Sequence, residues 1–147
     1  MLPRCDQPEL ERLLQPLTCR VEIPDWYRAL RAQHGNARSP VRPDERRRFA
    51  RFYFLTPALM KCHGNLSVVK RESELFVVHC LDISRNGIAF LHEAPLYPEE
   101  ELSLWLSLGR KTYTVRRCSR HSECCYEIGA KACGSGPVDR TVSAASR

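Results

Sequence analysis

The sequence predicts a mainly β protein, a small antiparallel barrel preceded by short N-terminal helices. From Arg51 onward, short β-prone runs are separated by Gly, Asn, Pro, Ser or charged turns, with no helical period between them. Within one of these runs, leucines recur at a strict period of two. The first forty-odd residues show helical spacing instead. Five or six strands with no helix between them favour a barrel, because closure removes exposed sheet edges.

The alternation is clearest at 102–108, where leucines occupy every second position and Trp105 is among the residues between them. Gly109 follows as part of a hairpin turn, and Tyr113 and Val115 alternate with threonines on the return strand. Such tight connections predict antiparallel neighbours. The β-prone runs are RFYFLTPALMKC, LFVVHCLDI, GIAFLHE, ELSLWLSL, TYTVRRC and CCYEIGAKAC.

Two short helices are expected before the strands. The first carries one apolar stripe of leucines from Leu10 to Leu17 at helical spacing, with Asp6 as its N-cap, and Pro16 limits it. The second begins at Asp25, runs to Ala32 and offers Trp26, Leu30 and also Ala29 to a neighbour. Both are too short to be stable alone, so they dock on the barrel, dock on a partner or contribute to self-association.

The 147 residues fit one domain with appendages. The stretch GNARSPVRPD is rich in breakers and separates the helices from the strands. We therefore divide the chain into a short helical N-terminal extension at 1–34, a linker at 35–44, a barrel domain at 45–133 and a disordered tail at 134–147.

A formal charge of +6 and a pI near 9.0 favour an anionic partner. The N-terminus MLPRCDQPEL has no apolar core of signal-peptide length, and no run approaches the ~18 apolar residues of a membrane span. These features predict a cytoplasmic protein without membrane insertion. The eight cysteines are then expected to be free thiols, since the compartment is reducing.

Three cysteines, Cys62, Cys80 and Cys133, lie in apolar runs and are expected to be small buried hydrophobes. A second group could meet around a zinc ion or could simply form a polar hairpin tip. We favour the hairpin tip and expect no metal, because no second C-x-x-C or paired histidines complete a tetrahedral set. This group comprises Cys118, His121, Cys124 and Cys125.

Two polar signatures indicate the function. Arg47 and Arg51 make an R-x-x-x-R spacing in DERRRFAR, and Asp82, Ser84 and Gly87 make a D-x-S-x-x-G spacing in DISRNG about thirty residues later. In this order and strand context, the pair resembles the PilZ domain family, the bacterial receptors for cyclic di-GMP. The resemblance covers roughly 43–133 and implies a six-stranded antiparallel barrel that binds this second messenger. Ligand-binding residues would be Arg46, Arg47, Arg51, Asp82, Ser84, Asn86 and Gly87.

The chemistry of cyclic di-GMP suits these residue types. A guanidinium can bind bidentately to phosphate oxygens or to guanine O6 and N7, and its plane can stack on a purine. An ionised Asp82 accepts from the guanine N–H donors, and Ser84 can donate or accept beside it. Gly87 is expected to supply a positive φ or a close backbone approach. Gly129 resembles the final-strand glycine of the family and has at least a structural role.

The leading hypothesis is a receptor or adaptor, not an enzyme, that needs no cofactor and changes conformation on binding cyclic di-GMP. Ligand would order the arginine segment and so alter how the helices present themselves to a downstream protein. An alternative is a basic barrel that binds RNA or single-stranded DNA, but no strand alternates aromatics with lysine. A second alternative is a PilZ-like scaffold that binds no ligand. The scattered histidines complete no catalytic arrangement.

Overall fold

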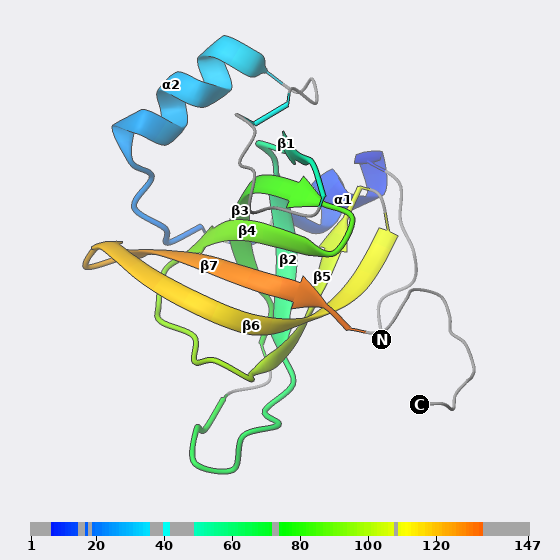
Figure 1. Cartoon of the computed structure of the whole chain (residues 1–147), viewed down its shortest axis with the longest axis vertical. Helices are drawn as coiled ribbons and strands as arrows, with labels where there is room; N and C mark the ends of the chain where they lie inside the picture. Colours follow the sequence, from blue (N-terminus) through cyan, green and yellow to red (C-terminus); the bar gives the residue numbers. More distant parts are fainter. Residues whose placement is uncertain are drawn as a thin grey trace.

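The computed structural model describes residues 7–14, 17, 19–35, 40–41, 49–71, 74–107 and 109–133 (Figure 1). The predicted mainly β class is confirmed. Two helices precede the strands, but the first has only eight residues, so the predicted helical extension is confirmed only in part. The elements are α1 (Gln7–Leu14), α2 (Asp25–His34), β1 (Arg51–Tyr53), β2 (Pro57–Cys62), β3 (Phe76–Ser84), β4 (Gly87–His92), β5 (Glu101–Leu106), β6 (Gly109–Ser122) and β7 (Cys125–Ala132).

Six of the strands close into an antiparallel barrel. The sheet order is β1-β3-β2-β5-β6-β7-β4, and pairing of β3 with β4 completes the ring. The first β-prone run is not one strand, because β1 and β2 share a single edge of β3. β1 pairs with its end at 82–84, and β2 pairs with its beginning at 76–79. Pro57 begins β2, a position where a missing N–H costs no ladder bond.

The barrel interior holds the main core. The predicted alternation in β5 is confirmed, since Leu102, Leu104 and Leu106 are all buried in it. The hairpin after β5 is also present, with Leu106 paired with Gly109. Gly109 has a φ of 121°, a backbone conformation that glycine adopts without strain. The barrel interior is thus a packed core.

The helix α1 covers the outer face of β2 and β5. Leu10 is fully buried against Leu59 and Trp105, and the other leucines of the predicted stripe pack around them. The helix ends at Leu14, before the last leucine of that stripe at Leu17. The expected N-cap and the proline expected to limit the helix, Asp6 and Pro16, lie outside the described residues.

The helix α2 contacts the outer face of β3 and β4 through Tyr27, which is 1% exposed. Its hydroxyl donates a 2.6 Å hydrogen bond to the carbonyl oxygen of Cys80. Trp26 also contacts the barrel, as predicted: its ring lies edge-on to that of His121 on β6, with centroids 5.3 Å apart, although Trp26 is 38% exposed. The buried contact through Tyr27 was not predicted. Leu30 is half-buried, as expected of a flanking contact. At the other end of α2, His34 stacks on Tyr53 of β1 with ring centroids 4.6 Å apart.

The expected bounds of the extension, linker, barrel and tail remain predictions. Most of the linker at 35–44 and all of the tail at 134–147 lie outside the described residues. Within the described part of the chain, neither helix is long and apolar enough to cross a membrane.

Candidate functional site

Strand pairing brings the second arginine of the first signature to the second signature. β1 runs antiparallel to the end of β3, so that Arg51 pairs with Ser84 and Tyr53 with Asp82. Alternation along a strand places side chains two residues apart on the same face. Arg51, Asp82 and Ser84 therefore share the outer face of the barrel, about thirty residues apart in sequence but adjacent in the sheet.

A bulge in β3 orients Asp82 outwards. The β3–β4 register shifts between Cys80 and Asp82, which leaves Leu81 as an extra residue on β3. Cys80 and Ile83 lie in the barrel core, whereas Leu81 packs on the outside beneath α2. Two consecutive residues thus face outwards, Leu81 toward the helix and Asp82 toward the signature arginine.

Arg51 and Asp82 form a partly buried ion pair. The Nε and Nη2 atoms of Arg51 donate to Oδ1 of Asp82 at 3.0 and 2.7 Å. The side chains are 18% and 8% exposed, respectively, so water screens this pair less than a surface pair. Two of the five guanidinium N–H groups are engaged in this way. Within the described part of the chain, the Nη1 amino group of Arg51 has no hydrogen-bond partner.

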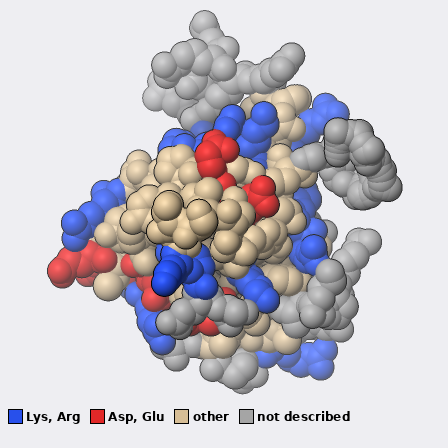
Figure 2. Space-filling model, turned by 90° about the horizontal axis from the view of Figure 1, so that it is seen from below, with Lys and Arg blue, Asp and Glu red and all other residues tan. Residues whose placement is uncertain are grey.

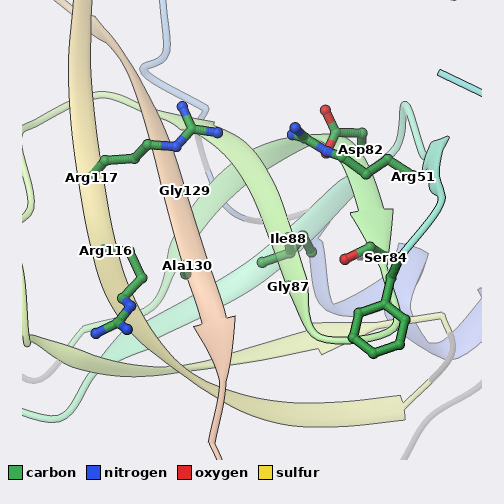
Figure 3. Close-up of a pocket in the computed structure, with 10 residues that line it drawn as sticks. Arg51, Asp82, Ser84, Gly87, Ile88, Arg116, Arg117, Gly129 and Ala130 are labelled. Atoms are coloured by element: carbon green, nitrogen blue, oxygen red, sulfur yellow. The ribbon is translucent and has the colours of Figure 1, made fainter. Parts of the chain in front are cut away.

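The ion pair forms one wall of a cavity of about 290 Å³ (Figure 3). β3 and β4 supply further lining, and β6 and β7 form the opposite wall. Three arginines and one aspartate line it, so its walls carry an excess of positive charge. The lining residues are Phe49, Arg51, Asp82, Ser84, Gly87, Ile88, Arg116, Arg117, Gly129 and Ala130.

Two glycines allow close approach at this cavity. A Cβ added at Gly87 would lie 2.9 Å from the backbone oxygen of Ala130, so a side chain there would push β4 from β7. Of the two roles expected for Gly87, close approach is the one observed, since its φ is not positive. A Cβ at Gly129 would instead lie 2.8 and 2.9 Å from Nε and Cγ of Arg117. Gly129 therefore makes room for that side chain.

Comparison with known proteins places the chain in a family. A family model described as PilZ domain matches residues 45–130, more than half of the chain. The chain belongs to the PilZ family. Neither a curated protein nor a solved structure matches it. PilZ domains are in general receptor domains without catalytic activity, and cyclic di-GMP is the ligand associated with the family.

The structure brings only part of the predicted PilZ site together. Arg51, Asp82, Ser84 and Gly87 line the cavity. Asn86 does not line it, and its backbone oxygen accepts a 2.7 Å hydrogen bond from the N–H of Ala132. The remaining predicted residues, Arg46 and Arg47, lie outside the described residues, and their role stays a prediction.

Sequence reasoning missed Arg116 and Arg117 as cavity residues. The sequence does indicate a break in the alternation of this strand. Strict alternation after Tyr113 and Val115 would place the charged side chain of Arg117 in the core. The side chain that packs against the core is instead Cys118. A charged residue at an inward position, followed by a small apolar one, predicts a bulge that restores the pattern.

The cysteine-rich hairpin does not gather metal ligands. Among the described residues, no group of three or more His, Cys, Asp or Glu side chains could hold a metal ion. Cys125 is buried beneath α2, and the Nε2 atom of His121 lies 2.9 Å from Oε1 of Glu127. Cys62 and Cys80 are buried as expected. Cys133 is only half-buried, so that expectation was wrong for this residue.

Proposed function

We propose that this PilZ protein is a cytoplasmic receptor that binds cyclic di-GMP on the outer surface of the barrel and transmits binding to a protein partner. The observation that carries the proposal is the Arg51–Asp82 pair in a cationic cavity that Ser84 and Gly87 also line. Both signatures of the family contribute to that cavity. Ligand binding would involve no catalysis and no cofactor.

The cavity chemistry matches a guanine dinucleotide better than a simple anion. Phosphate alone requires only cations, whereas the acceptor oxygens of Asp82 suit the N1–H and N2–H donors of guanine. Arg51 would keep Asp82 in place and present its remaining N–H groups to a phosphate or a guanine edge. The cavity volume of about 290 Å³ is just below the ~300–1,000 Å³ usual for ligand sites. We propose that Arg46 and Arg47 complete the grip from the adjoining segment.

A route to a partner exists through α2. The strands that carry Arg51 and Asp82 also contact this helix, through Tyr53 and Cys80 respectively. We propose that ligand orders the segment 42–51 and shifts α2, which changes the surface offered to a downstream protein. The domain division into extension, linker, barrel and tail is part of this proposal.

Nucleic acid binding is not favoured by a specific observation. On the face shown in Figure 2, the described basic side chains form several separate groups with acidic residues between them, not one continuous band. A continuous basic surface with stacked aromatics would be expected of a single-strand binder.

Isothermal titration calorimetry of the full chain tests the proposal. We expect a Kd for cyclic di-GMP in the micromolar range or tighter, and much weaker binding of GMP, because only the dinucleotide reaches both signatures.

Arg47→Ala and Arg51→Ala should each weaken binding by roughly ten- to a hundredfold, since each removes charge-assisted contacts. Lys61→Ala, on β2 outside the cavity, is the matched control and should bind like the wild type. Absence of heat and of a thermal shift at saturating cyclic di-GMP would refute the proposal.

A further inference from the structure

We propose that Arg116 and Arg117 of β6 form a second cationic wall of the site, which holds the half of cyclic di-GMP that Arg51 and Asp82 do not hold. Neither arginine belongs to the two sequence signatures. The inference rests on the proposed function and names further binding residues for it.

A bulge in β6 places both arginines on the same outer face. The β6–β7 register shifts between Val115 and Arg117, so Arg116 is the extra residue. Val115 before the pair is fully buried in the barrel core, and Cys118 after it packs against that core. Arg116 and Arg117 are both exposed, and both line the cavity. A regular strand would have turned one of the two guanidiniums toward the interior.

The surface of β7 beside Arg117 leaves space for the arginine side chain. Gly129 is its register partner on β7, and the missing side chain of this glycine leaves space for the Arg117 stem. Figure 3 shows Arg117 directed over β7, on the side of the cavity opposite Arg51 and Asp82. Among the described residues, its guanidinium has no ion-pair or hydrogen-bond partner, so its five donors can all be offered to a ligand.

Arg116 is also available. Its only acidic partner in the described part of the chain is Glu99, at 3.4 Å, with both side chains more than half exposed. Such a surface pair contributes little and can be exchanged for a ligand contact.

Charge and symmetry make cyclic di-GMP a suitable occupant. Its two phosphodiesters carry two negative charges, and the described cavity walls have three guanidiniums against one carboxylate. The ligand consists of two identical halves, each with one phosphate and one guanine. Arg51 and Asp82 lie on one side of the cavity and the β6 arginines on the other, so each side can engage one half (Figure 3). Guanidiniums bind bidentately to a phosphate or to guanine O6 and N7, which suits either contact.

The test compares single variants of the full chain by calorimetry with cyclic di-GMP at about 150 mM salt. Arg116→Ala and Arg117→Ala should each lower affinity by about ten- to a hundredfold. Arg110→Ala removes the same charge from the same strand, six residues from Arg116 and therefore ~20 Å away. That control should change affinity less than twofold, because salt screens charges beyond ~8 Å.

Gly129→Ala tests whether the position of the Arg117 side chain, and not only its charge, is needed for binding. The added Cβ would displace the Arg117 side chain from its Cγ outward while every charge is kept. We expect a loss of affinity comparable to that of Arg117→Ala, with the thermal midpoint recorded to verify folding. Wild-type binding together with unchanged affinity in Arg116→Ala and Arg117→Ala would overturn this inference and leave the proposed function standing. No binding by the wild type would overturn both.

Discussion

At the scale of single residues, the site depends on one acid among bases. Asp82 is held by two hydrogen bonds from Arg51 and is mostly buried. A cavity that only attracted anions would gain nothing from a carboxylate, because like charges repel. The acid is therefore the residue that separates recognition of guanine from attraction of phosphate.

Asp82→Ala tests this distinction. We expect at least tenfold weaker binding of cyclic di-GMP, because the guanine acceptor is lost and Arg51 loses the partner that positions it. Calorimetry with cyclic di-GMP and cyclic diadenylate measures the effect. Asp25→Ala is the matched control, since it removes one carboxylate that is fully exposed on α2, and it should leave affinity unchanged. Tighter binding in Asp82→Ala, with equal affinity for both dinucleotides, would contradict guanine recognition.

At the scale of elements, bulges on two strands shape the site. The bulge in β3 turns Leu81 and Asp82 outwards together, and the bulge in β6 does the same for Arg116 and Arg117. The helix α2 is attached at the first of these bulges, because the Tyr27 hydroxyl bonds to the carbonyl of Cys80. Burial raises the pKa of Tyr27, so the hydroxyl remains a donor at neutral pH. Burial also lowers the pKa of His79, whose ring meets that of Tyr27 edge to face, to about 4 and keeps it neutral.

Tyr27→Phe removes that attachment without removing the ring. We expect the free energy of unfolding to fall by about 1–3 kcal/mol, because the variant leaves a buried carbonyl without its hydroxyl donor. Urea denaturation followed by circular dichroism measures it. Tyr97→Phe makes the same chemical change at a side chain that is 48% exposed, and should stay within about 0.5 kcal/mol of the wild type. Equal stability of both variants would show that α2 is held by apolar packing alone.

At the scale of the whole molecule, the sequence predicts the barrel and half of its site. The alternating leucines of β5 and the two signatures are local patterns, so the sequence alone was enough to interpret them. The burial of Tyr27 depends on where β3 presents a carbonyl acceptor, and no local pattern contains that information. The bulge beside Arg117 does leave a trace in the local sequence, but the space that Gly129 provides for this arginine depends on pairing between β6 and β7. The spacing of residues within one strand does not determine the pairing register between strands.

The final prediction concerns transmission from the cavity to the helices. The segment 42–51 contains seven charged residues and one proline, and it leads into β1, where Tyr53 stacks on His34 of α2. Ligand that bridges Arg51 and Asp82 should tighten both strands on which α2 rests. We expect hydrogen exchange to show protection gained at 42–51 on adding cyclic di-GMP, with a smaller gain in α2.

The turn at 66–69 serves as the internal control, because Figure 1 places it at the opposite end of the molecule from β1. Its exchange should not change. A segment 42–51 that is already protected without ligand would exclude the ordering mechanism while leaving binding intact. Protection gained there but not in α2 would mean that the signal leaves the protein through the arginine segment itself, since the contacts of Tyr27 and His34 would then transmit nothing.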